Sequence, residues 1–401
     1  MNKKLLFIIL YFYALAFSVL KTIRFPNSWS EAHWMMDYRF GFIKRGLAGA
    51  FFGFFFEKNE QNIFVLSVFL LLALYTSLFI IAYKETIRNN ENAFTLLLYV
   101  IFFLSQYIIF TAHLIGYLDH LIFLLSILVI GLLKKRKIII ASLLVSISIM
   151  IHEIALFLML PVCCFALVVT EMGKDQLSLK DVLASGLFKK IVVFLMLPVI
   201  VTLGVSMCQE FSGKDEHQQI FDYLSHLMFI KQNVADSVAS AYTVKFTTYF
   251  NEESPHFFQR IFVSKGSIFF GIPILFMMYL VFKQFEKVNK FLLITLGSIA
   301  IVPLFLHAIA WDTYRIWSFP FMVLFLGFWI LNSTMHVKNN VNKKLSTLEM
   351  GCAVISILFV SLVPNQLLDN EIERFSLIQR LTILLPLMIL GIIIIKKPQL
   401  K

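Results

Sequence analysis

The stretch that decides the fold is LIFLLSILVIGLLKKRKIIIASLLVSISIMIHEIALFLMLPVCCFALVVT, residues 121–170. Its charged residues are confined to KKRK (134–137) and to Glu153, which follows His152. About 20 apolar residues cross a bilayer as a helix, and a charged side chain at the bilayer centre is costly. We therefore expect turns at 134–137 and 152–153, which divide 117–170 into three short membrane helices. A single helix over 138–170 would bury His152 and Glu153 at membrane depth.

Similar apolar segments recur along the chain. It has 401 residues, of which 59% are hydrophobic and 15% charged, whereas soluble domains are about 25% charged. Segments suited to crossing a membrane lie at 4–23, 63–83, 93–112, 191–207, 266–282, 291–309, 316–333, 347–363 and 377–395. With the three helices of 117–170, they predict an all-α polytopic membrane protein with about 12 transmembrane helices. Residues 1–401 would form one integral membrane domain, and the first segment is expected to be a helix that is not cleaved.

The charge distribution predicts the orientation. The formal net charge is +11, and in the twelve-helix arrangement most lysines and arginines fall on the side of the two termini. Because basic loops stay in the cytoplasm, both termini are predicted to be cytoplasmic and the protein to lie in the cytoplasmic (inner) membrane. The basic balance then reflects topology and contact with membrane lipids, and gives no support to nucleic-acid binding.

This topology brings the ionisable clusters to the non-cytoplasmic side, facing the periplasm or exterior. A first external loop with an interfacial segment spans 24–62, and a long external loop spans 208–265, between helices 7 and 8. The clusters are residues 31–45, HLIGYLDH (113–120), IHE (151–153) and HAIAWDTYR (307–315). Ionisable residues beside a membrane mark function by default. Plainer roles stay open: Asp119 suits a helix cap, Lys44 and Arg45 suit lipid phosphates, and Asp312 and Arg315 suit a local ion pair.

Several common enzyme classes have no support in the sequence. We find no phosphate-binding P-loop, no G-x-G-x-x-G, no G-x-S-x-G and no C-x-x-C motif. ATP hydrolysis, nicotinamide chemistry and serine-hydrolase chemistry are therefore not indicated. The four cysteines form no disulfide framework, since two of them are adjacent and the others lie far apart.

Three features resemble the GT-C class of membrane glycosyltransferases. The first external loop carries an acidic residue, Asp37 or Glu31, soon after the first helix. YLDHLIFLLSILVIGLLKKRK (117–137) and ASLLVSISIMIHEIALFLMLPV (141–162) are similar to the next regions of that class, and DTYRIWSFPFMVLFLGFWIL (312–331) is similar to its later arginine-then-proline helix. The paired acidic motif of the class is loosened here, and a large soluble C-terminal domain is missing.

The resemblance implies sugar transfer from a polyprenyl-phosphate- or pyrophosphate-linked donor to a glycan or lipid-linked acceptor. Such transfer needs a carboxylate to take the acceptor proton and cations to hold the leaving phosphate. We assign Asp37 and Glu31 as catalytic candidates and Arg39, Lys44, Arg45 and Arg315 as phosphate-binding candidates. Residues to orient the sugar or acceptor are Asp119, His120, His152, Glu153 and Asp312. Their mixed ligands would suit Mg²⁺ or Mn²⁺, but the sequence assigns no metal.

Two other functions stay open. An O-antigen or capsule polysaccharide polymerase would use the same chemistry, with Arg39, Arg260 or Arg315 on the pyrophosphate, and the 208–265 loop favours it. A non-enzymatic transporter of lipid-linked glycans would place ionisable residues at the bilayer midplane and repeat its two halves. We see no internal repeat, and the charges lie at helix ends.

Overall fold

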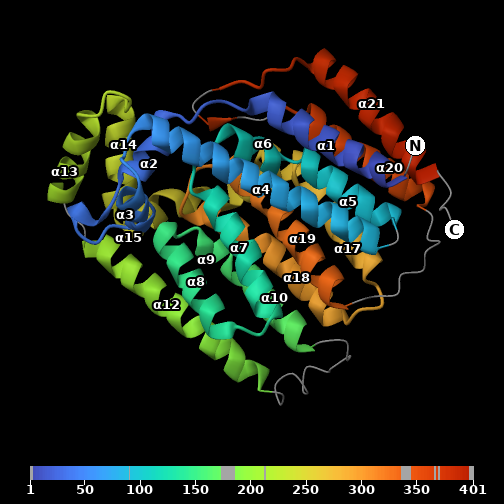
Figure 1. The fold of residues 1–401 in the computed structure, drawn as a ribbon, viewed down its shortest axis with the longest axis horizontal. Coiled ribbons are helices and arrows are strands. Elements are labelled where there is room, and N and C mark those ends of the chain that lie inside the picture. Colours follow the sequence, from blue (N-terminus) through green and yellow to red (C-terminus); the bar gives the residue numbers. More distant parts are fainter. Residues whose placement is uncertain are drawn as a thin grey trace.

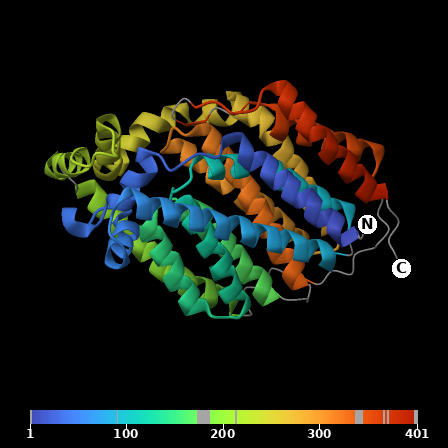
Figure 2. The ribbon, with the colours of Figure 1, turned by 45° about the horizontal axis from the view of Figure 1, so that its top comes forward.

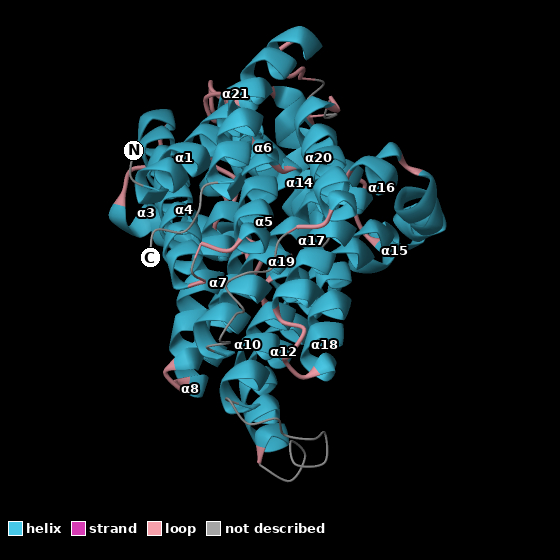
Figure 3. Cartoon of the chain, turned by 90° about the vertical axis from the view of Figure 1, so that its right-hand side faces the viewer, coloured by secondary structure: helices cyan, strands magenta, loops and turns pink. Residues whose placement is uncertain are grey.

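The computed structural model describes residues 3–89, 91–172, 186–211, 214–335, 345–364, 367–368 and 371–396. Within these ranges all regular structure is helical and no β-strand occurs (Figure 3). The predicted all-α fold class is therefore confirmed.

Nine helical segments in these ranges are long and apolar enough to cross a membrane. They are α1 (Lys3–Thr22), α4 (Glu60–Arg88), α5 with α6 (Ala93–Leu104, Gln106–His113), α9 with α10 (Ala155–Leu158, Leu160–Met172), α12 (Leu187–Phe211), α16 with α17 (Lys265–Phe269, Gly271–Gln284), α18 with the 3-10 helix η4 (Lys290–Ile301, Val302–Ala308), α19 (Thr313–Met335) and α21 (Leu377–Lys396). Three more helices are shorter: α7 (Asp119–Lys134), α8 (Ile138–Ile151) and α20 (Thr347–Leu362), with 16, 14 and 16 residues. The predicted count of about twelve includes these three and stays a prediction.

Both turns predicted in the 121–170 stretch are present. Helix α7 ends at Lys134 and α8 begins at Ile138, and α8 ends at Ile151 before α9 begins at Ala155. The hydroxyl of Ser142 in α8 donates to the carbonyl oxygen of Phe194 in α12 over 2.8 Å. Helices α8 and α12 therefore start side by side and run toward the same end of the molecule (Figure 1).

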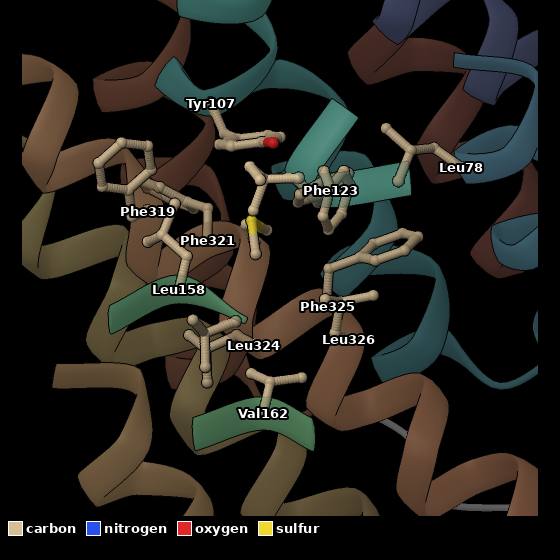
Figure 4. Packing of buried hydrophobic residues seen from close by; sticks show 14 of the residues in the cluster. Leu78, Tyr107, Phe123, Leu158, Val162, Phe319, Phe321, Leu324, Phe325 and Leu326 are labelled. Atoms are coloured by element: carbon tan, nitrogen blue, oxygen red, sulfur yellow. The ribbon is translucent and has the colours of Figure 1, made fainter. Parts of the chain in front are cut away.

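The core forms around α19 and the α5–α6 pair, whose side chains are almost all buried. The rings of Phe102 and Phe325 stack with centroids 4.2 Å apart, and Tyr107 meets Phe123 edge-on (Figure 4). At Gly327 an added Cβ would lie 2.2 Å from Leu296 Cδ1, so any larger residue would have to displace the Leu296 side chain where α18 packs on α19. Aromatic and aliphatic packing at this density holds the helix ends that carry the polar clusters.

The outer face of the bundle is apolar. Helix α12 exposes large apolar side chains along its length, including Phe188, Met196, Ile200, Leu203 and Met207. Exposed apolar surface of this extent is unfavourable in water, and lipid contact removes the penalty. This surface agrees with a protein of the membrane.

Two sets of short helices lie at the end opposite the start of α1 and the last turns of α21 (Figures 1 and 2). The first set follows α1: α2 (Ser28–Met35), the 3-10 helix η1 (Tyr38–Phe40) and α3 (Gly46–Phe55). The second set follows α12: α13 (Lys214–Ser225), α14 (Gln232–Thr243), α15 (Phe246–Glu253), the 3-10 helix η2 (Ser254–His256) and the π-helix η3 (Gln259–Val263). The segment predicted as a long external loop is thus largely helical.

Candidate functional site

A cavity of about 300 Å³ lies between the ends of several helices. It is lined by α2, the turn before α3, the turn after α8, the last turns of α12, parts of α14 and α15, and the start of α19. Six residues assigned to the site from sequence line it together, namely Lys44, Arg45, His152, Glu153, Asp312 and Arg315. These six come from three of the four clusters, and Tyr117 of the fourth cluster also lines the cavity.

Arg45 is held against Glu153 on one side of the cavity. Its Nε donates to Glu153 Oε2 over 2.8 Å and to Oε1 over 3.0 Å, and its Nη2 contacts the same carboxylate. Burial favours the neutral acid, but the charge and hydrogen bonds of Arg45 outweigh it and hold the pKa of Glu153 well below its usual value. Glu153 is therefore ionised, and both of its oxygens are bound by Arg45.

Arg45 adopts a backbone conformation that is rare outside glycine, with φ 60° and ψ 3° just before α3. Such strain persists where surrounding contacts fix the residue, and it is concentrated at functional sites. The guanidinium also lies over the ring of Tyr242, with 5.9 Å from Cζ to the centroid. The ion pair with Glu153 and the contact with the Tyr242 ring together fix the position of the Arg45 guanidinium at the cavity.

On the other side of the cavity, Arg315 binds two carboxylates, those of Asp119 and Asp312. Its Nη2 donates to Asp119 Oδ1 over 2.9 Å and its Nε to Asp119 Oδ2 over 3.0 Å, while Nη1 donates to Asp312 Oδ2 over 3.0 Å. Asp119 opens α7 and Arg315 lies in the first turn of α19, so this pair links two helix starts. Asp119 itself is not among the lining residues.

One carboxylate oxygen of Asp312 is not used by Arg315. Its Oδ1 is buried and, among the described residues, has no hydrogen-bond partner. Burial raises the pKa of this carboxyl, and the charge and hydrogen bond of Arg315 oppose the rise without cancelling it. A lining carboxylate with an unused acceptor and a raised pKa can take a proton from a bound hydroxyl.

Lys44 is the cavity cation that lacks a carboxylate. Within the described part of the chain, no Asp or Glu oxygen lies within ion-pair distance of its Nζ, which faces the ring of Tyr249 at 5.3 Å. Burial lowers the pKa of Lys44 to about 8, an effect that Glu153 opposes and Arg45 increases. A buried ammonium group of this kind is suited to an anionic ligand.

Two imidazoles complete the polar lining. His33 Nδ1 lies 3.1 Å from the hydroxyl of Tyr242, and His152 Nδ1 accepts from the backbone N–H of Ile154 over 3.2 Å. Burial, together with the nearby charge of Arg45, lowers the pKa of both histidines. Both are therefore neutral near pH 7 and can donate or accept hydrogen bonds without adding charge.

Asp37 and Arg39 lie outside the lining, in a second polar cluster. Asp37 Oδ1 accepts from Arg39 Nε over 2.8 Å, and its Oδ2 contacts the ammonium of Lys58. Burial would raise the pKa of Asp37, but hydrogen bonds from Arg39 and Lys58 hold it below its usual value. The guanidinium of Arg39 in turn lies 4.8 Å from the ring centroid of Tyr223 in α13. The catalytic and phosphate-binding roles assigned to these two residues from sequence stay predictions.

Glu31 and His120 are also buried away from the lining. Burial, aided by the charge of Glu60, raises the pKa of Glu31 to about 7. His120 Nε2 lies 2.9 Å from the carbonyl oxygen of Thr111, which fixes its ring against α6. Neither position brings these side chains to the cavity.

The structure identifies cavity residues that the sequence left open. Tyr249 comes from the 208–265 segment, and Trp311 and Phe246 are the strongly exposed members of the lining. Tyr242, from the same segment, is fully buried and contacts the lining residues His33 and Arg45 without lining the cavity itself. The apolar spacing 234, 235, 238, 239 and 242 in α14 is helical, so it was a signal that placed Tyr242 on a buried face. No comparable pattern distinguishes Tyr249 or Trp311.

A further contact joins two sides of the cavity. Arg260 Nη1 donates to the carbonyl oxygens of His307 and Ala310, over 3.2 and 3.1 Å, and its Nη2 lies 2.5 Å from Glu253 Oε2. Those carbonyls bracket the end of η4, just before Asp312. Arg260 therefore holds the segment that carries Asp312 against the end of α15.

Across the described ranges, no group of three or more His, Cys, Asp or Glu side chains is arranged to hold a metal ion. The arrangement offers a carboxylate base, three cations, two neutral imidazoles and an apolar side formed by residues such as Ile149, Phe157, Val205 and Phe319. It can bind an anionic group next to an apolar chain and remove a proton beside it. No protein-family model, no curated protein and no solved structure matches this chain.

Proposed function

We propose that the chain is a membrane glycosyltransferase that transfers a sugar from a polyprenyl-phosphate-linked donor on the outer face of the cytoplasmic membrane. The observation that carries the proposal is the pairing of Asp312, with its unused buried oxygen, and an uncommitted cation, Lys44, on one cavity. Sugar transfer from a lipid phosphate needs a proton acceptor and a cationic group for the leaving phosphate.

In the proposed reaction an acceptor hydroxyl attacks the anomeric carbon of the donor sugar. The new carbon–oxygen bond forms as the bond to the phosphate oxygen breaks, and the electron pair leaves with the polyprenyl phosphate. Asp312 takes the hydroxyl proton. Asp37, the base assigned from sequence, is held by Arg39 and Lys58, so the geometry favours Asp312 for this role.

The leaving phosphate is assigned to Lys44 and Arg45. Lys44 has no competing carboxylate among the described residues, while Arg45 already binds Glu153 and can share its remaining donors with the ligand. Arg315, paired with Asp119 and Asp312, mainly fixes the orientation of the base.

The apolar side of the cavity supports a lipid-linked donor. Thr202, Val205 and Ser206 of α12 line the cavity. Neighbouring α12 side chains such as Leu203 and Met207 are exposed on the outside of the bundle. An isoprenoid chain can therefore lie along the α12 side while its phosphate reaches Lys44. A soluble nucleotide-sugar donor would not need this surface.

We further propose that α7, α8 and α20 also cross the membrane, which gives twelve crossings, cytoplasmic termini and a cavity on the outer side. The exposed cations of residues 135–137 lie at the far end of α8 from His152, which agrees with this orientation. Single cysteines at Lys137 and Trp311 test it: an impermeant maleimide added to intact cells should label the second and not the first.

A polysaccharide polymerase is the second candidate. The specific observation in its favour is that the external helices α14 and α15 contribute Ala241, Phe246 and Tyr249 to the cavity. An external segment that forms part of the site suits a growing polymer as acceptor.

A deletion strain tests both candidates through the length distribution and composition of its surface glycan. Loss of one sugar or one branch supports the transferase. Loss of long chains with a single repeat unit retained supports the polymerase. An unchanged glycan, together with no sugar transfer by membranes that contain the protein, contradicts both.

A further inference from the structure

The end of the molecule opposite the cavity carries a compact group of cations, which we call the basic end: Lys135, Arg136, Lys137, Lys189 and Lys190. The first three form the turn between α7 and α8, and the last two lie in the first turn of α12. The hydrogen bond from Ser142 to Phe194, one turn further along each helix, shows that these two places are adjacent. Segments far apart in sequence thus form one positively charged surface.

The positive charge of this surface is only partly balanced. Glu171, at the end of α10, contacts Lys190 and lies 4.0 Å from the guanidinium of Arg136. Lys135, Lys137 and Lys189 are exposed, and within the described ranges no carboxylate forms an ion pair with them. A net positive surface remains.

An apolar surface continues directly from the basic end. The first turns of α8 expose Ile139, Ile140 and Leu143. The first turns of α12 expose Phe188, Val192, Val193 and Met196. A ligand that fits here has an anionic head next to long apolar chains, which describes a phospholipid.

We infer that the basic end and the adjoining faces of α8 and α12 bind an anionic phospholipid of the leaflet opposite the cavity. Its phosphate lies among Lys135, Lys137 and Lys189, and its acyl chains lie along the exposed side chains of α8 and α12. Clusters of lysine and arginine beside a membrane helix attract anionic lipids, and the attraction falls with ionic strength. A free phosphate or nucleic acid would leave the apolar faces uncovered. The inference does not depend on the reaction that the cavity performs.

The test uses the full-length protein in uncharged detergent, with phosphatidylglycerol or phosphatidylcholine added as the probe. The variant Lys137→Gln/Lys189→Gln removes one cation from each element and leaves both contacts of Glu171 intact. The control Lys287→Gln/Lys290→Gln removes two exposed lysines, one in the turn between α17 and α18 and one at the first position of α18, at the same end of the bundle. Bound lipid is counted by native mass spectrometry, and the unfolding midpoint is measured with each lipid.

We expect phosphatidylglycerol to bind the wild type and the control more tightly than phosphatidylcholine does, and to raise their unfolding midpoints. The double variant should bind phosphatidylglycerol about thirtyfold more weakly, since each lysine near the surface contributes about fivefold to affinity. Added salt should weaken binding to the wild type.

Three results would overturn the inference. Equal binding of the two lipids by the wild type would remove the preference for anionic headgroups. An equal loss in the control would show that total charge, not the basic end, decides binding. An equal midpoint shift with inorganic phosphate alone would show a simple anion site. If the variant fails to fold, the lipid preference and salt dependence of the wild type still decide the matter.

Discussion

Arg45 and Glu153 lie 108 residues apart in the chain and meet in a two-point ion pair at the cavity. The pair joins the turn before α3 to the turn after α8, so two loops that carry cavity residues are fixed to one another. It also explains how Arg45 is kept in its left-handed conformation.

Glu153→Gln should therefore destabilise the fold, because it leaves the charge of Arg45 without its partner. We expect a loss of about 1–3 kcal/mol in the free energy of unfolding. Thermal unfolding in detergent measures it, with the exposed Glu57→Gln as the matched control. A variant as stable as the control would show that the pair contributes little.

Sugar transfer should depend on pH through two cavity groups. Burial raises the pKa of Asp312, so its basic form is lost earlier than usual as the pH falls. Burial lowers the pKa of Lys44 to about 8, so its positive charge is lost as the pH rises above that value. The rate should then be bell-shaped, and Lys44→Arg should move the alkaline limb upward because arginine stays charged. A rate that is unchanged between pH 8 and pH 10 in the wild type would contradict the role of Lys44.

The folded state should become less stable as the pH rises, because of the titration of Glu31. Its pKa is about 7 in the folded protein, above the usual value of 4.5, because burial favours the neutral acid. Between these values the unfolded chain has released a proton that the folded chain still holds, so stability decreases as pH rises and levels off above about pH 7. Glu31→Gln should have the same unfolding midpoint as the wild type at pH 4 and a higher one at pH 8. An equal difference at both pH values would show that the carboxyl does not titrate in this way.

Arg260 should affect activity without touching substrate. Its bonds to the carbonyl oxygens of His307 and Ala310 position the segment that leads to Asp312. Arg260→Gln should lower the turnover rate by about tenfold or more at unchanged donor affinity, since small displacements of a base are costly. Glu253→Gln keeps the two carbonyl bonds and should have a smaller effect. A large rise in donor KM for Arg260→Gln would point instead to direct phosphate binding.

Much of the architecture could be predicted because membrane helices leave a strong signal. The turns at 134–137 and 152–153 followed from charges that a bilayer excludes, and alternating crossings then placed Lys44, Glu153 and Asp312 at one end. The position of Asp37 could not be predicted, because it depends on Lys58, which follows α3 in a segment without periodicity. The contribution of Tyr249 depends on how the short helices that follow α12 fold back over it, and no local pattern encodes that contact.

The side-by-side comparison of Asp312→Asn and Asp37→Asn tests the central claim most directly. The measurement is sugar transfer from a polyprenyl-phosphate-linked donor in membranes, normalised to the amount of folded protein. The account predicts that Asp312→Asn lowers the transfer rate by about 10²–10⁴ with donor binding retained, the range for loss of a general base, while Asp37→Asn loses activity only in proportion to folded protein. Full activity of Asp312→Asn, or complete loss in a normally folded Asp37→Asn, would contradict it.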